Sequence, residues 1–135
     1  RWPGKVAAGS ESDFPSYFPD VLPTVLELAG LADDRPHDGH SLLPIFHGGN
    51  FDRTKPLYWE HGDQQALRLG DWKLVRRRLG KKNPATKLFN LKEDPGEKKD
   101  LASTEPERLQ ELLEVSRNSR FPSKIFPNPG LDNDR

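Results

Sequence analysis

The sequence predicts an α+β fold, in which a small antiparallel sheet of about four strands is packed by a helix near the C-terminus and preceded by a separate helix. Four short segments between residues 56 and 91 contain aromatic and branched side chains that suit a pleated strand. The Gly70-Asp71 pair between two of them is typical of a two-residue hairpin turn, because glycine reaches positive φ without a Cβ clash. Leucines at spacings of three and four in residues 105–117 indicate an amphipathic helix.

The first fifty residues predict a different arrangement. Residues 5–16 contain Gly, Ser, Asp and Pro without periodicity, so a loop is expected there. Apolar residues then recur at spacings of three and four and end at Gly30, which predicts a helix over residues 19–29 with a left-handed glycine at its end. These apolar residues lie on more than one side, which is typical of a helix buried between layers. Ser41 is expected to cap a short helical turn over residues 42–46.

The later elements follow from local signals. The four predicted strands cover residues 57–59, 65–69, 72–77 and 87–91. Thr104 and Glu107 have the T-x-x-E spacing of a capping box, so the last helix is expected to begin at residue 105. Three leucines are expected to form its buried stripe: Leu109, Leu112 and Leu113.

Three regions result from these elements. Residues 1–50 hold a strand end, the first helix and the short helical turn, and residues 51–118 hold the sheet and its helix. Residues 119–135 form a proline-rich tail. Three large apolar residues indicate that part of this tail packs against the rest: Phe121, Ile125 and Phe126.

The composition limits the classes of function. The chain has 135 residues with 21 basic and 21 acidic side chains, and a neutral total argues against a dedicated nucleic-acid binder. Cysteine is absent, which excludes disulfides, thiolate metal sites and a cysteine nucleophile within these residues. No apolar run has the length of a membrane span, and the start has no secretory signal. Hydrophobic residues make up 33%, which is lean for a self-sufficient core, and the sequence starts without methionine. A piece of a longer protein is therefore expected.

Five short motifs occur in a characteristic order. They are RWPG at 1–4, DVLPTVLELAG at 20–30, DGHSL at 38–42, GDWKL at 70–74, and LFNL at 88–91 followed by Asp94, Pro95 and Glu97. Each motif is weak alone. Together, over about residues 1–102, they resemble the C-terminal part of the formylglycine-dependent sulfatases, which are arylsulfatase-like members of the alkaline-phosphatase-like superfamily.

The resemblance implies a parent protein that hydrolyses aryl or carbohydrate sulfate esters with calcium and a formylglycine. Residues 1–50 then correspond to the tail end of the catalytic α/β domain, so the first helix belongs to that larger domain. The family forms its formylglycine within C/S-x-P-x-R, which this sequence lacks, and holds its calcium upstream of the WPG strand. This chain is therefore expected to contain no catalytic residue and no metal ligand, to shape the substrate cleft, and to be inactive alone. Its implied partners are the N-terminal sulfatase domain and a sulfated small molecule or glycan. The compartment stays open, and a periplasmic or secreted location fits the family.

Glu60 and His61 are the candidate substrate-binding residues. They end an aromatic strand and enter a Gly-Asp loop, where a polar side chain can project into a pocket. The resemblance implies that this sheet borders the substrate cleft, so His61 can contact a sulfated substrate. The alternative is an ordinary loop histidine that makes surface hydrogen bonds.

A basic stretch supplies the second candidate site. Residues 66–90 contain eight basic side chains against Asp71, a net charge of +7. Arg76, Arg77 and Arg78 are its candidate anion-steering residues, and a non-catalytic module that binds anionic glycans through this stretch is the alternative function. The charges are equally explained as a solvated sheet face that protects strand edges.

Overall fold

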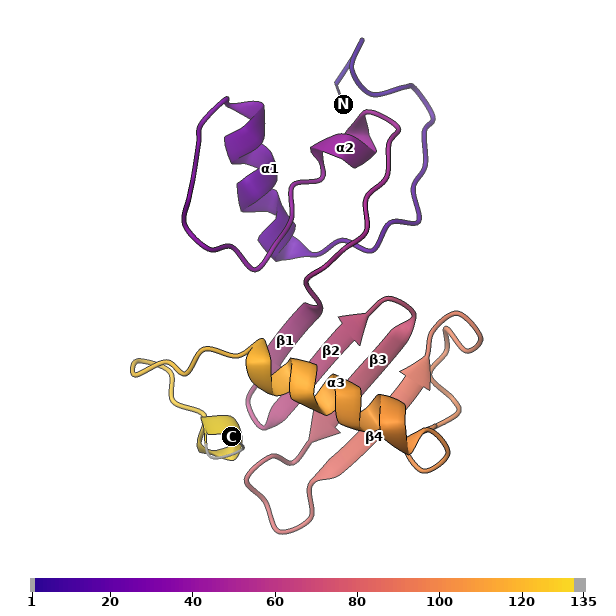
Figure 1. Cartoon of the computed structure of the whole chain (residues 1–135), viewed down its shortest axis with the longest axis vertical. Helices are drawn as coiled ribbons and strands as arrows, with labels where there is room; N and C mark the ends of the chain where they lie inside the picture. Colours follow the sequence, from indigo (N-terminus) through magenta and orange to yellow (C-terminus); the bar gives the residue numbers. More distant parts are fainter. Residues whose placement is uncertain (1, 133–135) are drawn as a thin grey trace. The chain divides into compact units, whose positions relative to one another are not determined.

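The computed structural model describes residues 2–132 of the chain. The chain divides into two compact units, unit 1 from Arg1–Leu57 and unit 2 from Tyr58–Arg135. Unit 1 is mainly helix and loop, whereas unit 2 is a sheet with helices (Figure 1).

Unit 1 contains a 3₁₀ turn, η1 (Phe18–Asp20), followed by α1 (Val21–Leu28) and a short helix, α2 (Leu43–Phe46). The predicted helix is confirmed, with a 3₁₀ first turn. Gly30 ends it with φ of +66°, and Leu31 N donates to Leu26 O at 3.0 Å. The short helical turn is also confirmed, but the predicted cap is not: the N-cap residue is Leu42, and no side chain caps the helix. Ser41 Oγ accepts a hydrogen bond from Leu43 N at 3.2 Å from one position before the N-cap.

Helix α1 leaves much of its apolar surface uncovered. Thr24 is its one buried residue. Five large apolar side chains on η1 and α1 are between 43% and 86% exposed: Phe18, Val21, Leu22, Val25 and Leu28. An apolar face of this width is typical of a helix that packs between layers of a larger domain.

Unit 2 is built on a four-stranded antiparallel sheet with the order β1-β2-β3-β4. Its strands are β1 (Leu57–His61), β2 (Gln64–Leu69), β3 (Trp72–Arg77) and β4 (Ala85–Asn90). Leu69 pairs with Trp72 across the predicted two-residue turn, where Gly70 has φ of +59°. Helix α3 (Pro106–Asn118) covers one face of the sheet (Figure 1). The predicted sheet and its covering helix are confirmed.

A leucine row forms the core between the sheet and α3. Leu67, Leu74 and Leu88 are register partners on three neighbouring strands, so their side chains lie side by side on one face. All three are fully buried, as is Leu112 of α3. Leu109 and Leu113 pack against this cluster, which confirms the predicted stripe.

The predicted capping box is wrong. The N-cap residue of α3 is Glu105, and no side chain caps the helix. Thr104 Oγ1 instead donates to Leu101 O at 3.3 Å. Residues 101–104 form a turn in which Leu101 O also accepts from the backbone N of Thr104 and Glu105, so this turn captures the threonine hydroxyl.

Part of the tail packs as expected, but through different residues. Phe121, Ile125 and Phe126 are 79–83% exposed. A buried apolar residue is Leu131 in α4 (Pro129–Asp132), a short helix that the sequence did not indicate. The neighbouring Gly130 lies against the β3–β4 loop, where a Cβ would stand 2.7 Å from the backbone carbon of Leu79.

Candidate functional site

Glu60 and His61 are consecutive residues of β1, so their side chains point to opposite faces of the sheet. Glu60 accepts a hydrogen bond from the Tyr58 hydroxyl, and its carboxylate lies 2.8 Å from Arg120 Nε. His61 is the last residue of the strand and is exposed. A ligand on one face of β1 therefore meets only one of the two predicted residues.

Arg120 is a buried cation just beyond α3. Its side chain is 7% exposed, and it pairs with Glu60 and with Asp132 of α4. Burial lowers the pKa of Arg120, but the hydrogen bond to Asp132 and the charge of Glu60 outweigh burial and hold the pKa above its ordinary value. The guanidinium therefore stays charged and fastens the tail to β1.

A polar network continues from Glu60 toward β3. Gln65 is 3% exposed, and its Nε2 donates to Tyr58 Oη at 2.8 Å. Gln65 Oε1 accepts from Ser116 Oγ at 2.7 Å and from Arg76 Nη1 at 3.1 Å. Burial, followed by the hydrogen bond to Glu60, raises the pKa of Tyr58 above its ordinary value, so the phenol keeps its proton. This network binds α3 to three strands.

The sequence held a partial signal for this network. Ser116 lies four residues after the buried Leu112, and residues four apart share one face of a helix. A polar residue in the buried stripe needs a buried partner. The partner, Gln65, is 51 residues away in the chain, so spacing alone did not identify it.

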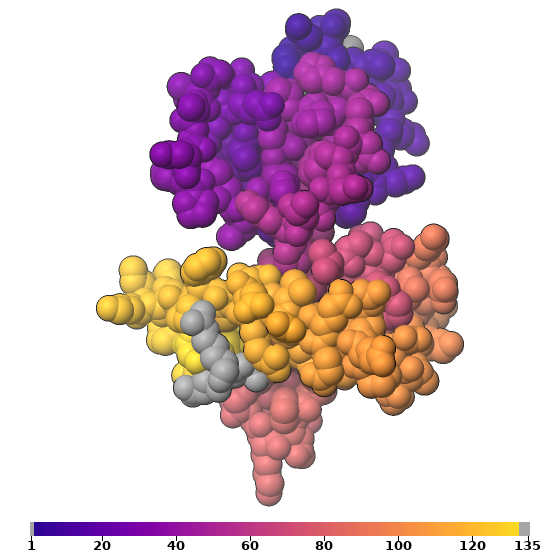
Figure 2. Space-filling view, in the orientation of Figure 1, coloured from indigo at the N-terminus to yellow at the C-terminus, as the bar shows by residue number. Residues whose placement is uncertain are grey.

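The three predicted arginines are separated by the strand geometry. Arg76 turns toward α3 and Gln65, whereas Arg77 is exposed at the end of β3. Arg78 is exposed and adopts φ of +60° as the chain leaves the strand. Lys81 and Lys82 are also exposed in the β3–β4 loop, which projects from unit 2 in Figure 2. Four cations are thus available to solvent on this projection.

Unit 1 contains a buried ion pair whose carboxylate also connects two of the sequence motifs. The Asp20 side chain is fully buried, and its Oδ2 lies 2.5 Å from Arg53 Nη2. Asp20 Oδ2 also accepts from Tyr17 N at 2.9 Å, and Oδ1 accepts from His40 N at 2.9 Å. Thr24 Oγ1 donates to Asp20 O and accepts from Leu42 N. These contacts tie the helix motif at 20–30 to the DGHSL motif.

The charges of this cluster follow from its contacts. Burial raises the pKa of Asp20, but the hydrogen bond from Arg53 and those from the His40 and Tyr17 backbones outweigh it, so the net shift is downward. Burial lowers the pKa of His40, and the positive charges of Arg53 and Lys55 lower it further. The cluster therefore holds an ionised carboxylate beside a neutral imidazole.

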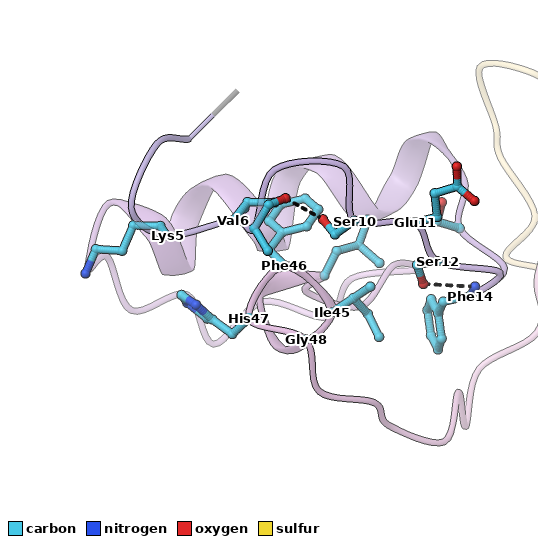
Figure 3. Close-up of a pocket in the computed structure, with 13 residues that line it drawn as sticks. Lys5, Val6, Ser10, Glu11, Ser12, Phe14, Ile45, Phe46, His47 and Gly48 are labelled. Atoms are coloured by element: carbon cyan, nitrogen blue, oxygen red, sulfur yellow. Dashed lines mark hydrogen bonds between the residues drawn. The ribbon is translucent and has the colours of Figure 1, made fainter.

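A cavity of about 460 Å³ lies within unit 1, between the loop at 5–16 and α2. Lys5 and His47 lie at one end of it and Glu11 toward the other (Figure 3). Phe14 and Ile45 contribute apolar lining. The cavity has room for a small polar ligand, and its residues were not predicted as a site.

No metal centre is formed within residues 2–132, where no group of three or more His, Asp or Glu side chains is placed to hold an ion. Asp33 Oδ1 accepts a hydrogen bond from Arg35 Nε at 2.8 Å, and Asp33 Oδ2 lies 3.3 Å from His37 Nε2. Calcium requires six to eight converging oxygens, which this part of the chain does not offer. None of the helices in the described structure is both long and apolar enough to span a membrane.

The comparisons with known proteins point to one group. No family model matches the sequence. Arylsulfatase K of Danio rerio is 31% identical over 123 residues, which are 84% of this chain and 23% of that protein. Human arylsulfatase D is 45% identical over 74 residues, which are 53% of this chain and 12% of that protein. The chain thus spans a quarter or less of the length of these relatives.

Solved structures share the fold. The crystal structure of Ps i-CgsB has a TM-score of 0.72 and 27% identity, covering 87% of this chain and 27% of that chain. The same protein in complex with k-i-k-neocarrahexaose has a TM-score of 0.59 and 26% identity, covering 74% and 23%.

Proposed function

This chain belongs to the sulfatases, as a C-terminal region of their alkaline-phosphatase-like fold, and from that premise we propose that the longer protein hydrolyses sulfate esters. The similarity to arylsulfatase K over 84% of the chain carries this proposal. On this proposal, residues 1–50 end the catalytic α/β domain, and the formylglycine and calcium lie in the preceding part. The substrate is an aryl or carbohydrate sulfate, and Ps i-CgsB bound to neocarrahexaose favours the carbohydrate.

The role that we propose for unit 2 is to form one wall of the substrate cleft. The network around Glu60 and Arg120 supports this role, because the buried Arg120 pairs with Glu60 of β1 and the Gln65–Ser116 hydrogen bond ties α3 to the sheet. His61 lies at the end of that rigid strand and is exposed. The contribution of unit 2 is then positioning and electrostatic attraction rather than bond making.

The longer protein is expected to turn over an aryl sulfate or a sulfated oligosaccharide, whereas the isolated chain is expected to do neither. The reason is that the chain carries no C/S-x-P-x-R sequence from which a formylglycine forms. Released sulfate, measured against a heat-inactivated control, checks both expectations. Turnover by the isolated chain, or none by the longer protein with either substrate, would contradict the proposal.

His61→Ala in the longer protein is expected to lower kcat/KM roughly 5- to 150-fold while leaving the melting temperature unchanged. The imidazole donates one hydrogen bond to a sulfate oxygen or sugar hydroxyl, and such a contact contributes about 1–3 kcal/mol. His47→Ala, which removes another exposed histidine, serves as the matched control. Wild-type kinetics for His61→Ala, or activity lost only in step with stability, leaves His61 an ordinary loop residue.

A second candidate function is the binding of anionic glycans without catalysis. The observation that favours it is the projecting β3–β4 loop with its four exposed cations, Arg77, Arg78, Lys81 and Lys82. Such a loop raises the local concentration of an anionic polymer. Salt-sensitive retention on a sulfated polysaccharide, together with no hydrolysis by the longer protein, would favour this candidate over the first.

A further inference from the structure

The sheet face opposite α3 carries a groove whose lining residues have no role in either proposed function. Leu67 and its register partners face α3, so the alternate residues Ala66, Arg68 and Lys73 lie on the other face. The groove has a volume of about 470 Å³ and is formed by this face together with the segment after β4.

One wall of the groove is an aromatic ring. Trp59 of β1 lines it and is 42% exposed. An indole presents a flat, polarisable apolar face with a polar edge, which suits a ligand that is apolar on one side and polar on its rim. The faces of a pyranose ring carry C–H groups, and its rim carries hydroxyls, so a sugar matches this surface.

The groove also carries a cation, Arg68, which a backbone carbonyl orients and which forms no ion pair within the described residues. Arg68 and Lys73 are direct cross-strand partners, and like charges placed opposite each other destabilise a sheet. Lys73 is neutralised by an ion pair with Glu97, which lies across the groove. Arg68 Nε donates to Gly70 O at 3.0 Å, whereas within residues 2–132 its terminal nitrogens have no protein acceptor. The guanidinium is thus oriented by the backbone while its outer donors remain available to an anion.

Glu97 is placed at the groove by an unusual backbone. It has φ of +53°, a left-handed conformation that non-glycine residues rarely adopt, and it is held there by the Lys73 ion pair and by a bond from Glu97 N to Asp94 O. Strain of this kind persists only where the surroundings impose it. Its carboxylate can accept a hydrogen bond from a ligand hydroxyl while it remains paired with Lys73.

We propose that this groove is a binding subsite for one sulfated sugar unit of a saccharide. The pyranose ring stacks on Trp59, the sulfate oxygens accept hydrogen bonds from the terminal nitrogens of Arg68, and a sugar hydroxyl donates to the Glu97 carboxylate. The choice of sulfate as the anion rests on the proposed function. The Trp59 surface that suits a sugar ring and the oriented Arg68 cation are observed independently of it. The subsite binds and orients a saccharide and takes no part in bond cleavage.

Calorimetric titration of the purified chain with a heparin-derived tetrasaccharide, and with the same tetrasaccharide after desulfation, tests this subsite. The wild-type chain is expected to bind the sulfated probe at least tenfold more tightly than the desulfated one. Trp59→Ala and Arg68→Gln are each expected to weaken binding of the sulfated probe by about tenfold or more, which is the usual effect of losing one charge-assisted contact. Trp59→Phe keeps an aromatic face and is expected to retain most of the affinity.

Arg117→Gln is the matched control, because it removes the same charge from an exposed position on α3, which covers the opposite face of the sheet from the groove. Circular dichroism of each variant confirms that the fold is kept, and Trp59→Phe remains informative if Trp59→Ala fails to fold. The subsite is overturned by absent binding, by equal affinity for the two probes, by unchanged affinity in Trp59→Ala or in Arg68→Gln, or by an equal loss in Arg117→Gln. If the longer protein releases no sulfate, the proposed function fails but the subsite does not. The two outcomes are distinguishable because the titration measures saccharide binding to the chain and does not depend on hydrolysis.

Discussion

Gly39→Ala is expected to destabilise unit 1 by more than about 3 kcal/mol, because the added methyl has no space. A Cβ at Gly39 would stand 2.2 Å from Pro19 O and 2.4 Å from Pro19 C. Both are backbone atoms at the start of the helix, so neither moves aside as a flexible side chain would. The expected result is a large fall in the midpoint of urea unfolding. The unfolding is monitored through a signal from unit 1, such as the fluorescence of Trp2.

Gly96→Ala is the matched control for this substitution. The nearest atom to a Cβ at Gly96 is the Lys98 Cε, at 3.3 Å, and this side-chain end can move. Its midpoint is therefore expected to stay close to the wild-type value. Equal midpoints for Gly39→Ala and the wild type would show that the contact between the DGHSL motif and the helix start is not as tight as described.

Arg53→Met is expected to destabilise unit 1 by about 3–5 kcal/mol at neutral pH, since it leaves a buried carboxylate without its cation. Asp20 keeps the backbone donors of Tyr17 and His40, but it is fully buried and cannot reach water. The substitution also removes the guanidinium that lies 5.4 Å from the centre of the Phe14 ring. Urea unfolding of both proteins at pH 7 measures the difference.

The same pair predicts a dependence on pH with a definite sign. The pKa of Asp20 lies below its ordinary value of 3.8 in the folded state, so the folded state binds the proton less tightly than the unfolded state. The stabilisation by this carboxylate is therefore complete above about pH 5 and is lost as the pH falls through the folded pKa. The gap between wild type and Arg53→Met should narrow between pH 5 and pH 3.

Arg35→Ala provides the control for a merely exposed ion pair, because the Arg35 side chain is 71% exposed where it meets Asp33. Exposed pairs are screened by water, so this variant should unfold with a nearly unchanged midpoint. A gap between wild type and Arg53→Met that stayed constant from pH 7 to pH 3 would contradict the assigned role of Asp20.

The elements that the sequence predicted well are those fixed by local contacts. Gly70 marks the β2–β3 turn, and Gly30 ends the helix, because each needs a positive φ that glycine adopts without strain. Thr104 shows the limit of such signals. Its hydroxyl could cap the helix or bond to the preceding turn, and in the structure it donates to Leu101 O of that turn. Leu131 became buried because Gly130 fits against Leu79, a contact between residues about fifty positions apart that no local pattern reveals.

The candidate site was less predictable for the same reason. Glu60 was recognised as a polar residue at a strand end, but its role depends on Arg120, which lies beyond the predicted helix. Arg76 was grouped with its two neighbours by charge, although alternation along the strand and the buried Gln65 separate it from them. Spacing identifies residue types along the chain, whereas the partners of buried charges are decided by which elements pack together.

The order of the strands in unit 2 also bears on how quickly it forms. Each strand pairs with the next one in sequence, and β2 and β3 are joined by only two residues. The entropy lost in closing such short loops is small, and folding rates rise as the sequence separation between contacting residues falls. Helix α3 follows β4, so the sheet can assemble before the helix docks on β2 and β3. Refolding of unit 2 is therefore expected to be faster than that of a sheet of equal size with crossover connections.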